Sequence, residues 1–94
     1  MTTVGMDYRV LPGKERVFED AFRSVLKALE GAAGHRRSRL YREVEAPAVY
    51  LILSEWDEPE AFKAFIESDR FRRVTDWGLD QVLASRPVHT VYGS

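Results

Sequence analysis

The sequence contains no cysteine in its 94 residues, so disulfide bonds, thiolate nucleophiles and cysteine metal sites are excluded. It has only two histidines, and no cluster of acids or histidines stands at metal-ligand spacing, so no metal site is expected. No apolar run approaches the roughly 20 residues that span a bilayer, and the first residues do not resemble a signal peptide. We therefore expect a cytoplasmic protein without a membrane partner.

The sequence also lacks a strong excess of positive or negative charge. The 14 basic and 15 acidic residues are interspersed and leave a formal net charge of -1, which does not favour nucleic acid as a partner. Apolar material is abundant, and 45% hydrophobic residues are enough for one small core. We expect a single domain over residues 1–94.

Four segments show the patterns of β-strands. In residues 4–10, 35–44 and 88–92, neighbouring side chains alternate between two sides with the period of two that a strand requires. Residues 49–53 form a nearly unbroken apolar run that continues to Trp56, which is typical of a central strand. A three-residue link joins the second and third strands, so they are predicted to be antiparallel neighbours.

Two helical regions separate these strands. In residues 14–30 the apolar side chains recur at the spacing of an amphipathic helix. A second helix is predicted to begin near Pro59, with Asp57 as its cap. Ser68 is predicted to cap a further helical segment that stops near Gly78.

The resulting order is strand, helix, strand, strand, helix, strand, which indicates an α+β fold. Right-handed crossovers place both helical regions on one face of a four-stranded antiparallel sheet. The other face is left bare, and its large side chains are expected to be chosen from Met6, Tyr8, Tyr41, Tyr50, Ile52 and Trp56. The simplest cover is a second copy of the chain, so we predict a homodimer with a cavity between the two sheets.

Short stretches spread over the whole chain carry a family resemblance. They are residues 8–15 with Phe18 and Phe22, then Gly34, Leu40-Tyr41, Tyr50, residues 54–57, Ala61-Phe62, Ser68, Phe71 and Arg86-Pro87. With these residues the chain resembles an antibiotic biosynthesis monooxygenase (ABM) domain. The resemblance implies a ferredoxin-like βαββαβ protomer, two of which form a dimeric α/β barrel.

The resemblance also implies a range of activities. These are cofactor-independent oxygenation of aromatic, quinol-type substrates, haem binding and degradation, and members without known chemistry. The haem-degrading branch resembles this chain at Phe62, Ser68 and Phe71. However, its tryptophan position is Phe65 here, and the position of its iron-ligating histidine is Thr75. The residues that carry the chemistry of that branch are therefore missing.

Tyr50, Ser54 and Trp56 share one side of the central strand and are candidate lining residues of the cavity. Trp56 stands where the strand meets the helix. The alternative is therefore a core tryptophan that closes the end of the barrel.

Arg39 and Tyr41 lie on the polar side of the second strand, where a guanidinium or a phenol would stabilise an enolate or phenolate. The alternative for both is an exposed position or a contact across the dimer. Tyr8 is a similar candidate, since it either reaches the cavity or is an interface aromatic.

The two histidines, His35 and His89, are the side chains whose ordinary pKa lies nearest neutrality. His89 lies in the last strand and is a candidate general base or iron ligand, but a hydrogen-bonded structural role is the simpler interpretation. His35 follows a glycine turn and is expected at the surface. If haem binds, one of these two histidines is the expected ligand.

Three functions remain open. The first is an oxidoreductase, a cofactor-independent monooxygenase that acts on an aromatic or polyketide-like molecule in a cavity between sheet and helices. The second is a haem-binding or haem-handling protein that lacks the usual histidine and tryptophan. The third is a non-catalytic dimeric module that binds a small molecule or is associated with stress. No catalytic residue is assigned, because no nucleophile, histidine and acid stand at a recognisable spacing.

Overall fold

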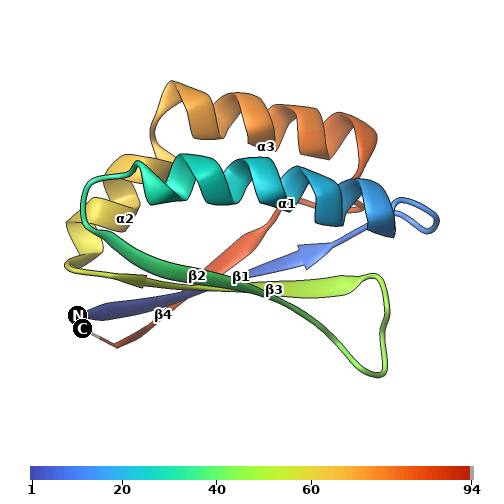
Figure 1. Ribbon diagram of the computed structural model, residues 1–94. Helices are drawn as coiled ribbons and strands as arrows, with labels where there is room; N and C mark the ends of the chain where they lie inside the picture. Colours follow the sequence, from blue (N-terminus) through green and yellow to red (C-terminus); the bar gives the residue numbers. More distant parts are fainter. Residues whose placement is uncertain (94) are drawn as a thin grey trace.

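The computed structural model describes residues 1–93, with Leu79 described by its backbone alone, so the last residue of the predicted domain lies outside the described residues. The elements are β1 (Thr2–Arg9), α1 (Glu15–Glu30), β2 (His35–Arg42), β3 (Val49–Trp56), α2 (Pro59–Ile66), α3 (Asp69–Gln81) and β4 (Val88–Gly93). The strands form an antiparallel sheet in the order β2-β3-β1-β4, and the helices lie together on one side of it (Figure 1). The predicted ferredoxin-like fold is confirmed. No helix in the described part of the chain combines the length and the apolar character needed to cross a membrane.

The side chains that face the helices are buried in the core. In β1 and β3 they are Val4, Met6, Tyr8, Tyr50, Ile52, Ser54 and Trp56. The prediction for the bare face was therefore wrong, because five of its six residues lie under the helices and Tyr41 alone lies on the other side. Alternation shows which residues share a side but not which side meets the helices. The helices cover the side with the larger side chains because so short a chain has little other material for a core.

The sheet face opposite the helices, called the open face below, has a small apolar centre. Leu51 and Leu53 of β3 lie in its middle, and Tyr41 of β2 pairs with Leu51. Tyr92 of β4 lies over Gly5 of β1, where an added Cβ would come within 2.6 Å of the tyrosine ring. The glycine at position 5 therefore makes room for an aromatic ring on the open face.

The helix starts follow the sequence signals only in part. Ser68 caps α3 as predicted, since the backbone N–H of Phe71 donates to its Oγ at 3.2 Å. The prediction for Asp57 was wrong, because no described side chain caps α2, which begins directly at Pro59. The carboxylate of Asp57 instead forms an ion pair with Arg36 at 2.5 Å. The opposite charge on the neighbouring strand competes with the helix end for the same carboxylate.

The turn into β2 requires a glycine at position 34. Gly34 has a φ of +80°, and an added Cβ would lie only 2.6 Å from the Cβ of Ala61 in α2. Its carbonyl accepts the backbone N–H of Asp57 at 2.8 Å. This turn therefore holds the start of β2 against the start of α2.

Helix α3 is fixed at its ends and loosely packed between them. After its C-terminal end, the backbone N–H of Leu11 donates to the carbonyl of Val82 at 2.7 Å, and that of Ala84 donates to the carbonyl of Arg9 at 2.8 Å. Between these bonds and the Ser68 cap, its described side chains are half-buried or exposed. Few described side chains therefore anchor the middle of α3 to the rest of the protein.

Candidate functional site

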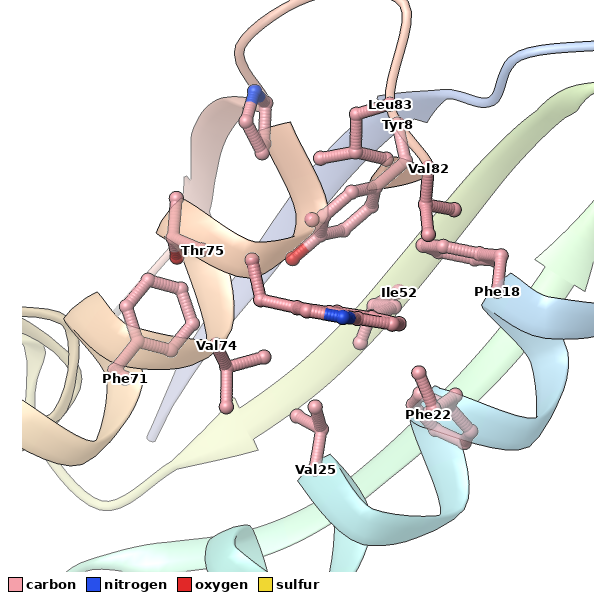
Figure 2. Close-up of a pocket in the computed structure, with 14 residues that line it drawn as sticks. Tyr8, Phe18, Phe22, Val25, Ile52, Phe71, Val74, Thr75, Val82 and Leu83 are labelled. Carbon is pink, nitrogen blue, oxygen red and sulfur yellow. The ribbon is translucent and has the colours of Figure 1, made fainter. Parts of the chain in front are cut away.

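An apolar cleft lies between α1, α3 and the sheet (Figure 2). Its walls include Phe18, Phe22 and Val25 of α1, Phe71 and Val74 of α3, and Tyr8 and Ile52 of the sheet. On both helices these residues follow the three- and four-residue spacing that puts side chains on one face. Gly78 of α3 also lines the cleft, and a Cβ added there would contact the side chain of Leu83 at 3.4 Å.

The cleft has little polar character. Only Tyr8, Thr75 and Trp77 bring polar side-chain atoms to it, and none of the described lining residues ionises near neutral pH. General acid-base catalysis by a carboxylate or a histidine is therefore unsupported at this site. Because the described lining supplies no base, a ligand that loses a proton here must itself be acidic enough to lose it to solvent.

The cleft is small in this conformation. The space that the centre of a water molecule can reach inside it measures about 50 Å³. Such a volume holds a few water molecules, whereas pockets for small organic ligands measure roughly 300–1,000 Å³. A ring compound would therefore fit only if the middle of α3 moved away from α1.

Tyr8 places a hydrogen-bond donor in these apolar surroundings. Its side chain is only 9% exposed, and its hydroxyl points into the cleft in Figure 2. The partner of this hydroxyl among the described residues is the sulfur of Met6, 3.6 Å away, which is a weak acceptor. Burial raises the pKa of Tyr8 well above its ordinary value, so the phenol stays protonated. The protonated hydroxyl of Tyr8 is therefore suited to donate a hydrogen bond and poorly suited to act as a base.

Packed aromatic rings lead from Tyr8 out of the cleft. The ring centroids of Tyr8 and Phe18 are 5.2 Å apart, and those of Phe18 and Tyr50 are 4.7 Å apart. The hydroxyl of Tyr50 donates to a carboxylate oxygen of Glu19 at 2.5 Å. Burial, reinforced by this carboxylate, raises the pKa of Tyr50 to about 12. Tyr50 therefore ties β3 to α1 and holds Phe18 in place as a wall of the cleft.

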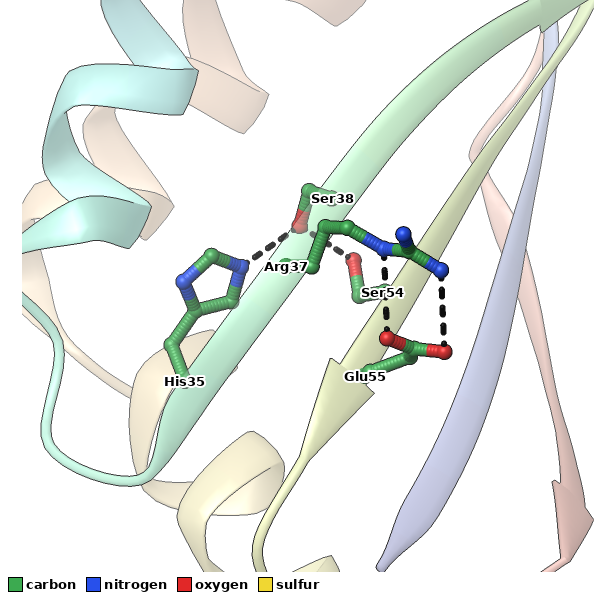
Figure 3. A network of polar contacts seen from close by, with 5 residues as sticks. All are labelled: His35, Arg37, Ser38, Ser54 and Glu55. Carbon is green, nitrogen blue, oxygen red and sulfur yellow. Dashed lines mark hydrogen bonds and ion pairs between the residues drawn. The ribbon is translucent and has the colours of Figure 1, made fainter.

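A polar network joins β2 to β3 elsewhere on the helix side of the sheet (Figure 3). Nε2 of His35 hydrogen-bonds Oγ of Ser38 at 2.7 Å, which in turn hydrogen-bonds Oγ of Ser54 at 2.8 Å. Partial burial lowers the pKa of His35, so its imidazole is neutral at physiological pH. Ser54 is 4% exposed and does not line the cleft, so this network has a structural role.

Trp56 belongs to the core. It is fully buried, and its ring centroid lies 5.8 Å from that of Phe62 and 5.6 Å from that of Phe65. The ring of His35 packs edge-on against it at 5.0 Å. These contacts agree with the packing alternative given above for Trp56.

The remaining candidates lie away from the cleft. Arg39 and Tyr41 are on the open face, and Tyr41 is 46% exposed. His89 lies on the exposed edge strand, with its ring 5.3 Å from that of Phe62. Of the seven side chains predicted from the sequence, the structure therefore brings only Tyr8 into the cleft.

The sequence reasoning missed most of the cleft. Phe22, Val25 and Val74 resemble ordinary core positions of amphipathic helices, and nothing in their spacing separates a packed face from a hollow one. Only the structure reveals the incomplete packing of the described residues there, since Trp77 beside Gly78 lines the cleft and is 43% exposed.

Metal ligands do not gather in the structure. Within residues 1–93, no group of three or more histidine, aspartate or glutamate side chains is placed to hold a metal ion. The lining of the cleft offers no histidine or methionine either.

The sequence matches a known protein family and several curated proteins. The sequence model of the antibiotic biosynthesis monooxygenase family matches residues 1–77. A protein of Haloarcula marismortui named "Putative heme-binding protein" is 38% identical over 87 residues, which cover 93% of this chain and 13% of that protein. A Halobacterium salinarum protein of the same name is also 38% identical, over 93% of this chain and 18% of its own length. The chain thus spans less than a fifth of the curated relatives that it matches.

Solved structures show the same fold. One is named "Putative antibiotic biosynthesis monooxygenase from Nitrosomonas europaea" and has a TM-score of 0.87 at 16% identity, covering 99% of this chain and 88% of its own. A conserved protein from Methanosarcina mazei has a TM-score of 0.86 at 22% identity, covering 99% of this chain and 91% of its own. At these identities the likeness establishes the fold alone.

Proposed function

This chain belongs to the antibiotic biosynthesis monooxygenase family, and we propose that it oxygenates a hydrophobic ring compound held in the cleft between α1, α3 and the sheet. The observation that carries the proposal is the Tyr8 hydroxyl, which is buried among apolar side chains and whose partner among the described residues is a thioether. A donor whose partner is only a weak acceptor, placed in an apolar cleft, suits a ligand that is mostly hydrocarbon and bears one oxygen acceptor.

The reaction that fits this lining begins with a substrate that forms its own carbanion. An anthrone is an example, because its CH₂ group lies between two aromatic rings and its carbonyl becomes an enolate oxygen when the proton leaves to solvent. Molecular oxygen adds to the carbanion carbon, and loss of water from the hydroperoxide gives an anthraquinone, so one anthrone and one O₂ yield one anthraquinone and one H₂O. Tyr8 donates to the enolate oxygen as its negative charge develops.

Oxygen uptake with a panel of anthrones and quinols tests the proposal. Tyr8→Phe is expected to lower kcat about 100-fold with little change in KM, because it removes a donor to the developing oxyanion. Tyr41→Phe makes the same chemical change on the open face and is expected to retain full activity. Equal losses in both variants would contradict the role of Tyr8. A null result for the wild-type protein across the panel would favour the non-catalytic binding module.

Haem binding is the second candidate, and the names of the archaeal relatives favour it. Those names describe proteins of which this chain matches less than a fifth, so they do not locate the haem on the matched part. The residues present do not fit haem in the cleft, since His35 is engaged by Ser38 and His89 lies on the edge strand.

A hemin titration separates the two candidates. We expect no Soret shift, or a shift that is unchanged in His35→Ala and in His89→Ala. A saturable shift with one hemin per chain that disappears in one of these variants would support haem binding. It would also assign the iron ligand.

We further propose that the open face pairs with the open face of a second copy. Leu51 and Leu53 lie at its centre, and Tyr41 and Tyr92 add ring surface that is 46% and 60% exposed. Exposed apolar surface of this kind supports a protein interface. A two-fold arrangement buries the same residues on both copies.

Leu53→Asp is expected to convert such a dimer into a monomer. It places one carboxylate from each copy in the middle of an apolar contact, which should weaken association at least about 100-fold. Val17→Asp on the exposed side of α1 is the matched control and should leave association unchanged. Equilibrium sedimentation measures both variants, and a folded wild-type protein that stays monomeric would remove this proposal.

A further inference from the structure

The cleft continues along α3 into a second hollow. Val25, Phe71 and Val74 line both hollows, and the second adds Ser24, Phe65 and Arg70. Because three lining residues are shared, the two hollows adjoin each other between α1 and α3, and together they are called the groove below. Most of the residues that line the groove are apolar, and Arg70 lines its second hollow.

The charges on α3 make this end of the groove positive. Arg70, Arg72 and Arg73 stand in the first half of the helix, and Asp76 and Asp80 stand in the second half. The partial positive charge at a helix N-terminus disfavours cations nearby, so helix stability does not account for three arginines there. Asp69 alone follows the usual preference for acidic residues in the first turn. The arginines instead add to the positive potential of the helix end.

Arg70 differs from its two neighbours in its surroundings. Arg72 and Arg73 line a surface hollow together with Asp69 and Asp76. Arg70 lines the groove, where the described residues include no aspartate or glutamate, and it forms no ion pair with any described residue. The chain as a whole carries a net charge of -1, so attraction of an anion to this point is local.

We propose that the ligand of the groove is a hydrophobic acid. Its rings occupy the apolar cleft beside Tyr8, and its carboxylate lies against the guanidinium of Arg70, with the hydroxyl of Ser24 nearby as a further donor. The planar fork of an arginine matches the two oxygens of a carboxylate. This inference rests on the proposed function, because the rings bind in the same cleft, and it adds the charge of the substrate.

Two probes of nearly equal size test it by isothermal titration calorimetry at neutral pH and low salt. They are 2-naphthoate, which carries the acid, and 2-naphthalenemethanol, which does not. The wild-type protein is expected to bind 2-naphthoate about fivefold more tightly than 2-naphthalenemethanol. A gain of this size is typical of a solvent-exposed ion pair. Arg70→Met keeps the apolar stem of the side chain and is expected to abolish this preference without changing the affinity for the alcohol.

Arg73→Met is the matched control, because it removes the same charge from the same helix but lies outside the groove. It is expected to retain the preference for 2-naphthoate. Equal affinities of the wild-type protein for the two probes, or equal effects of the two substitutions, would overturn the inference and leave the proposed function standing. Failure of the alcohol to bind would instead overturn the proposed function, because its affinity depends on the cleft alone.

Discussion

Replacing Ala21 by phenylalanine is expected to abolish binding of ring compounds while leaving the protein folded. Ala21 lines the cleft from α1, where the reachable space is only about 50 Å³. A phenyl ring at this position fills that space and adds to the apolar contacts between α1 and α3. Because a bound ligand places most of its surface inside its pocket, exclusion from the cleft should lower affinity about 100-fold or more.

The measurement is calorimetric titration with 2-naphthalenemethanol, together with oxygen uptake on any substrate that the wild-type protein turns over. Ala64→Phe makes the same change at an exposed position of α2 and serves as the control. Unaltered binding by Ala21→Phe, with the fold confirmed by circular dichroism, would show that ligands bind elsewhere. Equal losses in both variants would show a general effect of added bulk.

Replacing Trp56 by alanine is expected to have the largest effect on stability. The side chain is fully buried, and it contacts the rings of His35, Phe62 and Phe65. Removing a buried tryptophan costs about 3–5 kcal/mol. Small domains have a total free energy of unfolding of roughly 5–15 kcal/mol, so a large share of the stability would be lost.

Urea denaturation of Trp56→Ala, Trp56→Phe and Trp77→Ala measures this effect. The milder Trp56→Phe substitution keeps the comparison informative if the alanine variant does not fold. Trp77→Ala should cost much less, because that side chain is 43% exposed at the cleft. A loss in Trp56→Ala no larger than in Trp77→Ala would contradict the placement of Trp56 in the core.

The fold was predictable because its signals are local. Alternation and helical spacing gave every strand and helix to within a few residues, and the Ser68 cap is made as expected. Asp57 was misjudged because its partner, Arg36, is 21 residues away in the sequence. The choice of the covered sheet face was misjudged for a related reason, since it depends on how the helices pack and not on any one strand.

The site was less predictable than the fold. Tyr8 was identified as a candidate, but its role depends on the apolar surroundings that α1 and α3 bring to it. Backbone bonds at Leu11 and Ala84, between residues far apart in the sequence, fix the C-terminal end of α3. The periodicity of the sequence does not indicate how α1 and α3 are placed around Tyr8.

The most direct test of the account asks on which side of β3 a ligand lies. Ile52 faces the cleft, whereas its neighbours Leu51 and Leu53 face the opposite side of the sheet. With methyl-labelled protein, intermolecular nuclear Overhauser effects from bound 2-naphthalenemethanol are expected at Ile52, Val25 and Val74. Contacts confined to the methyl groups of Leu51 and Leu53 would place the ligand on the open face and contradict the proposed site.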